Sequence, residues 1–435
     1  MGLRGRVRSG VPVILSVLSL VVAATAGGED VLKLPIGDPA RRDREAPLTL
    51  DAITDTAAGT TLTPADLARR LEGVRLVLVG EGHTEMDTHR VEKRVVEELA
   101  GAGQRVTIGL EMYPYTEQKA LDDWIAGRLS EGAFLDASRW YANWGYNWLY
   151  YRDIFLFARE RKIPLVAINA PREVVSAVRK KGFQGLTPEE AAHIPTDIDA
   201  KNADHMRFFK ATLGDAAFHG GMDEAAWQSM LDAQCTWDAT MGRHAVQPLG
   251  NDPDPRAVVV VLVGAGHVEY GLGIERQVKR TFDGKIASVI PVPVENADGA
   301  PVRSVQASYA NFVWGIPRET DPLYPDLGVS TRVRAEDQRL EIIHIEDDSP
   351  AARGGLKPAD LLVALDGAPL TDRATLSRLM AGKLWGDAAV FAVLREGAPA
   401  TVEVPLRRTL AAKAAAKAAA TAATAATPTP APPPR

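Results

Sequence analysis

The sequence predicts an α/β protein: a mostly parallel sheet with flanking helices and a helical insertion, followed by a small β-rich domain. Two observations support this prediction. Between residues 74 and 292, short Val-rich apolar runs alternate with helical segments, and such runs are typical of strands buried on both faces of a parallel sheet. After residue 326, short apolar runs follow one another closely, which is typical of a small domain built mainly of strands.

The first domain is defined by its alternation of strands and helices, which places helices on both faces of the sheet. The expected strands are residues 74–79, 106–110, 165–168, 258–263 and 286–290. The expected helices are residues 64–71, 90–100, 117–126, 150–160, 188–192, 203–212 and 224–242. The segment between the third and fourth strands, residues 169–257, is largely helical and is expected to form a lid or subdomain.

The second domain is expected at residues 326–408. Its expected strands are residues 328–333, 340–345, 361–365, 389–394 and 400–405, and its expected helices are residues 349–354 and 372–380. Residues 27–73 are taken as a lead-in to the first domain, and residues 293–325 as a linker. The Ala- and Pro-rich tail, residues 409–435, is expected to be disordered.

The N-terminus has the pattern of a secretory signal peptide over residues 1–26. Three arginines precede an apolar stretch at residues 11–22, and Ala24-Thr25-Ala26 supplies a small-x-small cleavage site. We therefore expect an exported protein, periplasmic or extracellular. Since no Cys follows the apolar stretch, we do not expect a lipoprotein.

The net charge argues against some classes of partner, and the cysteine content argues against a disulfide. The net charge is −6, and loss of the three N-terminal arginines makes it more negative. Nucleic acid and an anionic membrane surface are therefore not expected as partners. The single Cys235 can form no internal disulfide, and we expect it to be a buried small apolar residue.

Two copies of Gly-x-x-His are the most informative motif. Gly80-Glu81-Gly82-His83 follows the first expected strand, and Gly264-Ala265-Gly266-His267 follows the fourth. Ligands of open α/β sheets bind beyond the carboxyl ends of the strands. Glu111 and Asn169 follow the second and third strands, so we expect these side chains to share one site with both histidines.

The chemistry of this residue set leaves two possibilities open. Two imidazoles with the carboxylates of Glu81 and Glu111 suit a divalent metal such as Zn²⁺, Mn²⁺ or Fe²⁺, with one carboxylate acting as general base on a metal-bound water. The same groups could act without metal, with a histidine as base and a glutamate to orient it. His-Glu-x-x-His and Gly-x-Ser-x-Gly are both absent from the sequence, which argues against the common zinc-protease and serine-hydrolase arrangements.

Aromatic residues crowd the segment 140–151, and Tyr113 and Tyr115 follow Glu111 closely. We expect most of them to pack in the core and a minority to contact a flat ligand such as a porphyrin. His89 lies shortly beyond His83 and could reach the same cleft. His205, His219 and His244 are expected at the surface or at helix caps.

The first domain resembles the ChaN-like haem-binding proteins of the wider Tiki/TraB group. The resemblance rests on residues 78–83, 109–112, 144–146, 167–172 and 263–267, together with Gln118, Leu121, Asp122, Tyr151, Gln234, Asp238 and Met241. It implies either haem binding linked to iron acquisition or, as in the Tiki branch, a metal-dependent peptidase.

By position, the resemblance implies that Glu81, His83, Glu111 and His267 form the shared catalytic or metal-binding site. The residues that it offers for haem or cofactor binding are His89, Tyr113, Tyr115, Asn169 and Arg172, the first three as axial ligands.

The second domain resembles a PDZ domain. Leu327-Gly328-Val329-Ser330 matches the carboxylate-binding loop, and residues 349–352, 355–360 and 365–367 match further PDZ segments. The resemblance implies a peptide or protein C-terminus as partner, bound by strand addition.

Three functions remain open on this reading. The leading one is an exported protein that binds haem or iron and recruits a partner through its PDZ domain. The second is a metal-dependent hydrolase of the peptidase type. The third is a scaffold in which the ChaN-like site is vestigial and only the PDZ-like domain functions.

Overall fold

The computed structural model describes residues 30–214, 222–250, 252 and 254–408. The signal peptide expected at residues 1–26 and the tail expected at 409–435 lie outside the described residues, as does His219. The chain divides into two compact units, with the boundary between Tyr324 and Pro325. Within the described residues, no helix combines the length and apolarity needed to span a membrane.

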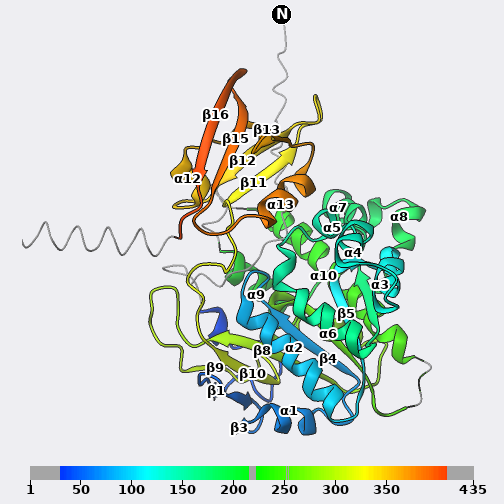
Figure 1. The fold of residues 1–435 in the computed structure, drawn as a ribbon. Helices are drawn as coiled ribbons and strands as arrows, with labels where there is room; N and C mark the ends of the chain where they lie inside the picture. Colours follow the sequence, from blue (N-terminus) through cyan, green and yellow to red (C-terminus); the bar gives the residue numbers. More distant parts are fainter. Residues whose placement is uncertain (1–29, 215–221, 251, 253, 409–435) are drawn as a thin grey trace, which may run out of the picture. The chain divides into compact units, whose positions relative to one another are not determined.

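The larger unit is built on an eight-stranded mixed sheet with the order β3-β2-β10-β8-β4-β7-β5-β6 (Figure 1). The strands from β10 to β6 are parallel. Strand β2 is antiparallel to β10, and β3 is antiparallel to β2. Every expected strand is present, which confirms the predicted mostly parallel sheet. The strands are β2 Ile53–Asp55, β3 Thr60–Leu62, β4 Leu76–Glu81, β5 Arg105–Pro114, β6 Leu165–Asn169, β7 Ala257–Gly264, β8 Ile286–Pro293 and β10 Phe312–Ile316.

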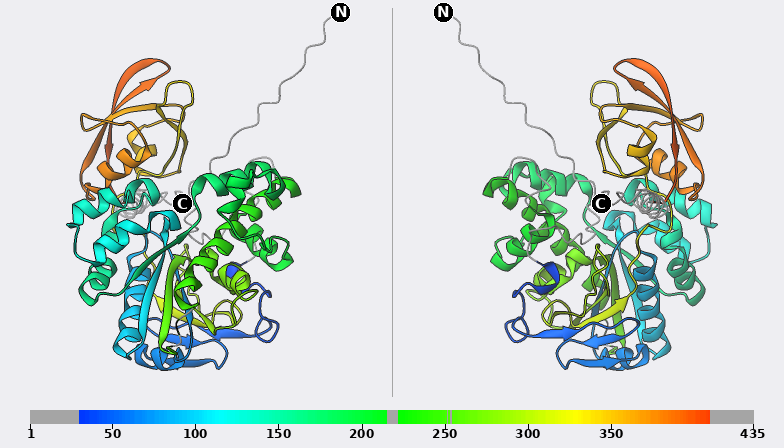
Figure 2. Two further views of the ribbon diagram at one scale, coloured as in Figure 1. Left: turned by 90° about the vertical axis from the view of Figure 1, so that its right-hand side faces the viewer. Right: turned by 90° about the vertical axis from the view of Figure 1, so that its left-hand side faces the viewer.

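Helices cover both faces of this sheet (Figure 2). Alternate residues of β4 point to opposite faces: Val77 and Val79 pack with α2 and α6, whereas Leu76 and Leu78 pack with Met241 of α10. The helices are α1 Pro64–Arg70, α2 Met86–Gly101, α3 Gln118–Ile125, α4 Glu131–Ala137, α5 Trp140–Asn143, α6 Arg152–Arg161, α7 Arg172–Lys181, α8 Pro188–Ala192, α9 Ala203–Leu213, α10 Glu224–Val246 and α11 Ile274–Val278.

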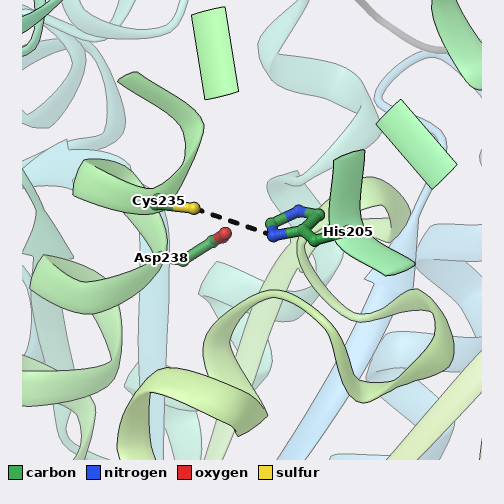
Figure 3. Close-up of side chains that lie close together, drawn as sticks. All are labelled: His205, Cys235 and Asp238. Carbon is green, nitrogen blue, oxygen red and sulfur yellow. Dashed lines mark hydrogen bonds between the residues drawn. The ribbon is translucent and has the colours of Figure 1, made fainter. Parts of the chain in front are cut away.

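The helical insertion between β6 and β7 is present and contains α7 to α10. Its α9 and α10 bring His205, Cys235 and Asp238 together in the interior, with Nδ1 of His205 3.7 Å from Sγ of Cys235 (Figure 3). His205 is fully buried, so the expectation of a surface or capping role was wrong. Cys235 is buried as predicted, but its neighbours are polar rather than apolar.

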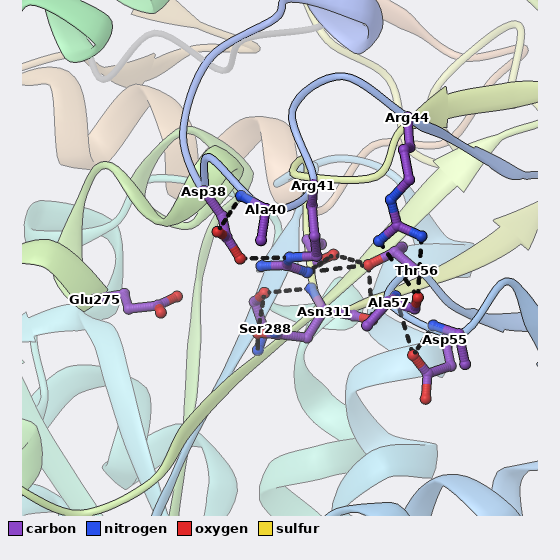
Figure 4. Close-up of polar contacts among 12 residues, drawn as sticks. Asp38, Ala40, Arg41, Arg44, Asp55, Thr56, Ala57, Glu275, Ser288 and Asn311 are labelled. Atoms are coloured by element: carbon purple, nitrogen blue, oxygen red, sulfur yellow. Dashed lines mark hydrogen bonds and ion pairs between the residues drawn. The ribbon is translucent and has the colours of Figure 1, made fainter.

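The lead-in and the expected linker both contribute to the larger unit. Strands β2 and β3 come from the former and β10 from the latter, where Phe312 pairs with Val289 of β8. A small two-stranded sheet joins β1 Glu45–Pro47 to β9 Ser304–Gln306. Polar contacts also hold these segments: Arg41 donates to the Thr56 hydroxyl at 3.1 Å, and Oδ1 of Asn311 accepts the backbone N–H of Ser288 in β8 at 2.9 Å (Figure 4). Arg41 also donates to the carbonyl of Ala310 at 3.1 Å.

The smaller unit is an antiparallel sheet with the order β11-β12-β13-β15-β16, with β14 paired to β13. The strands and helices expected there are present. They are β11 Val329–Val333, β12 Leu340–Ile345, α12 Pro350–Gly354, β13 Leu361–Leu365, β14 Ala368–Pro369, α13 Arg373–Ala381, β15 Ala388–Arg395 and β16 Ala398–Pro405. Strand β11 lies at the sheet edge.

Candidate functional site

The two Gly-x-x-His motifs lie side by side because β4 and β7 are adjacent and parallel. In their register, Glu81 is opposite Gly264 and Gly80 is opposite Val263. A Cβ atom on Gly80 would lie 3.1 Å from the Cα of Ala265, so a larger residue at that position would push the two motifs slightly apart. The predicted meeting of both motifs at one sheet edge is confirmed.

The first motif holds its histidine with its own glutamate. Nδ1 of His83 lies 2.7 Å from Oε1 of Glu81, and the hydroxyl of Tyr151 donates to the same oxygen at 2.7 Å. Burial acts to raise the pKa of Glu81, but His89 and His83 outweigh it and hold that pKa well below its usual range. Glu81 is therefore ionised, and it orients the His83 ring through Nδ1.

The second motif's histidine is held by a carboxylate from a different element. Nδ1 of His267 lies 2.6 Å from Oδ1 of Asp238 on α10, and the amide of Gln234 is 2.9 Å from the same nitrogen. Nε2 of His267 lies 3.4 Å from Oε1 of Glu111. Burial would lower the pKa of His267, but Asp238 and Glu111 outweigh it and raise that pKa to about 10.

Glu111 joins the two motifs. It lies on β5, next to β7, and its Oε2 accepts the backbone N–H of Gly264 at 2.7 Å. A Cβ atom on Gly264 would lie 3.3 Å from Nε2 of His83 and 3.7 Å from Oε2 of Glu111. Glycine thus leaves room where the His83 ring and the Glu111 carboxylate approach each other. Burial opposes ionisation of Glu111, but the hydrogen bond and charge of His267 lower its pKa.

The two histidines share one feature. A carboxylate fixes Nδ1 of each ring, and Nε2 is turned toward the region of Glu111. Carboxylate-to-imidazole contacts of this kind are typical of histidines that ligate metal ions, and two histidines with one carboxylate suit Zn²⁺ or Fe²⁺. Without metal, His83 oriented by Glu81 has the form of a general base.

His89 joins the same cluster through Glu81. Nδ1 of His89 lies 2.9 Å from Oε2 of Glu92 and 3.3 Å from Oε2 of Glu81. Its Nε2 lies 3.3 Å from the backbone oxygen of His83. Burial would lower the pKa of His89, but Glu81 and Glu92 raise it to about 10.

The other residues that were predicted to bind haem or a cofactor do not gather at one place. Asn169 borders the site, since its amide donates to the backbone oxygen of Glu111 at 2.8 Å. Tyr113 is fully buried, donates to Ser138 at 3.1 Å and packs in the aromatic core. The hydroxyl of Tyr115 lies 2.7 Å from Nδ1 of His193. Arg172 is exposed, and it donates to the backbone oxygen of Asn143 at 2.9 Å.

The aromatic segment is mostly core, as predicted: Trp140, Trp144, Trp148, Tyr150 and Tyr151 are buried. Two of its rings also flank the site. The rings of Trp144 and Tyr146 have their centroids 4.7 and 5.1 Å from that of His83. The His83 ring therefore packs against two aromatic side chains.

Sequence reasoning assigned no role to Gln234, Asp238 or Glu92. Gln234 and Asp238 are four residues apart in a predicted helix and therefore share one face, which was the available signal. Glu92 follows His89 by three residues on α2, again on one face. Their roles depend on which helix face meets the sheet edge, which periodicity alone leaves open.

The segment predicted to bind a C-terminus begins the edge strand of the smaller unit. Val329 and Ser330 start β11, whereas Leu327 is buried in the core. Gly328 has a φ of 68°, a conformation that favours glycine. Its N–H donates to Oδ1 of Asp326 at 2.6 Å.

Comparison with known families agrees with this architecture. Residues 67–278 match the family described as haem-binding uptake, Tiki superfamily, ChaN, and residues 325–406 match the PDZ domain. The chain contains a ChaN domain followed by a PDZ domain. Both resemblances drawn from the sequence are thereby confirmed.

Two solved structures are similar to parts of this chain at low sequence identity. A structure described as cofacial heme binding to ChaN of Campylobacter jejuni is 17% identical, with a TM-score of 0.48, and the match covers 61% of this chain and 98% of that one. The HtrA3 PDZ domain bound to a phage-derived ligand is 18% identical, with a TM-score of 0.17, over 18% of this chain and 82% of that one.

A curated protein of Mesorhizobium japonicum, described as a "putative zinc metalloprotease", is 36% identical over 61 residues. The match covers 14% of this chain and 16% of that protein. The chain thus spans about a sixth of the length of this relative.

Proposed function

We propose that this protein is exported and binds iron through its ChaN domain, as an ion or as haem, while its PDZ domain captures the C-terminus of a partner. In this proposal His83, His267 and Glu111 hold a divalent ion. One observation carries it: a carboxylate fixes Nδ1 of each histidine, and Nε2 of each is turned toward the Glu111 region. Export is supported by the sequence of residues 1–26.

The buried carboxylates of the site favour the binding of a cation. Glu111 has Oε1 3.4 Å from Nε2 of His267 and offers a ligand atom within 4.8 Å of one of His83. Glu81 and Asp238 add a buried carboxylate beside each histidine. In the absence of metal, a proton on His267 compensates these acids, which is why its pKa is raised to about 10. A divalent cation at Nε2 supplies the same compensation, and when bound it would act as a Lewis acid on a water or carbonyl.

The residues offered as haem ligands differ in their availability. The Tyr113 hydroxyl is buried against Ser138, and both ring nitrogens of His89 face carboxylate or carbonyl oxygens. Tyr115 is partly exposed and stacks on His244 with ring centroids 4.0 Å apart. Its hydroxyl lies 2.7 Å from Nδ1 of His193, but both of these side chains are partly exposed, unlike Tyr113 and His89. Tyr115 is therefore the axial ligand that we propose for haem, with a site separate from the ion.

A metal-dependent hydrolase, with peptides as substrates, is the second candidate. The observation that favours it is the ionised Glu81, which orients His83 and accepts a hydrogen bond from Tyr151. Such a pair can take a proton from an attacking water. The PDZ domain would then recruit the peptide.

Metal analysis and haemin titration of the purified protein test the proposal. We expect one equivalent of metal to be lost in a His83→Ala, His267→Ala double variant, and a saturable Soret shift to be lost in Tyr115→Phe but kept in Tyr113→Phe. Absence of both metal and haem would overturn the proposal. Metal-dependent peptide cleavage that is lost in the double variant would favour the hydrolase, and a function lost only on deletion of residues 326–408 would favour the scaffold.

A further inference from the structure

A second group of buried ligand-type side chains lies beside the first site. Glu81, His89 and Glu92 each offer a ligand atom within 4.8 Å of those of the other two. Glu92 and His89 are one turn apart on α2, which directs both toward the end of β4. Tyr150 and Tyr151 cover the His89 ring, with centroids 5.7 and 4.3 Å from it.

The hydrogen bonds within this group leave one carboxylate oxygen of each glutamate without a partner. Both glutamates are buried, and Oε2 of Glu81 and Oε1 of Glu92 have no hydrogen-bond partner. Nδ1 of His89 faces both carboxylates but can donate only one proton. A buried carboxylate without a full set of partners destabilises the fold unless charge or hydrogen bonds compensate it.

Two arrangements can neutralise such a group. Protons alone can do so if Glu92 stays protonated, and burial together with the charge of Glu81 does raise the pKa of Glu92 well above its usual range. In that arrangement Glu92 donates its single proton toward Glu81, and the proton on Nδ1 of His89 is shared between the same two carboxyls. A divalent cation satisfies both carboxylates at once and takes Nδ1 of His89 as a third ligand.

We propose that Glu81, His89 and Glu92 form a second divalent-cation site in the ChaN domain. Two carboxylates and one imidazole suit Mn²⁺ or Fe²⁺. Glu81 serves both sites, since its Oε1 orients His83 and its Oε2 faces the second cation. The second site goes beyond the proposed function and shares only this residue with it.

The other buried group of this kind is less suitable for a cation. His205, Cys235 and Asp238 also lie within ligand distance of one another. However, the guanidinium of Arg276 lies 3.0 Å from Nδ1 of His205 and 3.6 Å from Sγ of Cys235. The guanidinium already supplies a positive charge beside these side chains. The group that contains Glu92 is therefore the better candidate for a cation site.

Titration of the metal-free full-length protein with Mn²⁺, followed by electron paramagnetic resonance, tests the second site. The wild type should bind two equivalents, Glu92→Gln one, and His267→Ala one. Glu97→Gln is the matched control, because Glu97 lies on the same helix in an ion pair with Lys93, and it should bind two. Glu92→Asp, which withdraws the carboxylate by one methylene, should weaken one class of site at least about tenfold.

The outcomes separate the two sites. A wild type with one equivalent that is lost in His267→Ala and kept in Glu92→Gln would overturn the second site and leave the first. One equivalent that is lost in Glu92→Gln and kept in His267→Ala would support the second site and contradict the first. If Glu92→Gln fails to fold by circular dichroism, Glu92→Asp decides: unchanged stoichiometry and affinity in it would overturn the second site.

Discussion

Asp238 lies 2.6 Å from Nδ1 of His267, and this contact joins helix α10 to the second Gly-x-x-His motif. Asp238 is fully buried, and burial raises the pKa of its carboxyl, although His267 opposes this. The pair fixes the ring with Nε2 toward Glu111. The acid therefore acts on the site through the orientation and basicity of the histidine.

Asp238→Asn should weaken metal binding by about 10- to 100-fold while leaving every proposed ligand in place, because the amide accepts a hydrogen bond without the charge. Calorimetric titration with Zn²⁺ measures the change. Asp232→Asn is the control, since Asp232 lies on the same helix and bonds to Gln228 instead. Equal affinity for both variants would show that the carboxylate of Asp238 has no role in the site.

Gly264→Ala should disrupt the site without unfolding the domain. The added methyl would lie 3.0 Å from Cε1 of His83 and 3.3 Å from its Nε2, so the ring must move away from Glu111. We expect at least about a tenfold loss of metal affinity by the same titration. Gly101→Ala is the matched control, because a Cβ there meets no atom within 4 Å; an effect of similar size in both would contradict the account.

The acid stability of the protein should depend on His205. Burial, assisted by Arg276, holds the pKa of its imidazole down to about 3, against about 6.5 in the unfolded chain. Between these values the unfolded chain binds the extra proton, so the free energy of unfolding falls as the pH drops from 6.5 toward 3.

Urea unfolding at pH 7 and pH 4.5 measures this dependence. The wild type should lose about 2 kcal/mol more than His205→Gln over that interval, because glutamine cannot take the proton. Only the change in the free energy of unfolding between the two pH values is compared, so an effect of the substitution that is the same at both pH values cancels. Equal losses in the two proteins would refute the assignment of a neutral buried imidazole.

Asp326→Asn should strengthen binding of a peptide with a free C-terminus. Oδ1 of Asp326 accepts the N–H of Gly328 at 2.6 Å in the loop before the edge strand β11, where the proposed ligand carboxylate would approach. Removal of the like charge should raise affinity roughly three- to tenfold. Fluorescence anisotropy with free and amidated peptides checks this: the gain should be confined to the free carboxylate.

The position of the site could be predicted from sequence, because parallel strands deliver their carboxyl ends to one edge. That rule placed Glu81, His83, Glu111 and His267 together, and the structure brings them into contact. Asp238 matches the ChaN-like pattern, but its contact with His267 escaped prediction because Asp238 lies on a helix, 29 residues before its partner. Only the packing of α10 against the sheet determines which face of that helix meets His267.

Short strands at and near the edge of the sheet could not be predicted from the sequence either. Strands β2 and β3 have three residues each, too few for an alternation pattern to stand out from a loop. Strand β10 has five residues, but it lies in a segment bounded by Gly and Pro that was expected to be a linker. Its pairing with β8 depends on contacts far apart in the sequence, which local patterns do not encode.

The most direct test of the central claim is an anomalous-difference map from crystals of the protein soaked in Zn²⁺. We expect a peak in contact with Nε2 of His83, Nε2 of His267 and the Glu111 carboxylate, and loss of that peak in His267→Ala crystals. A map from well-ordered, metal-soaked crystals with no peak at these three residues would contradict it.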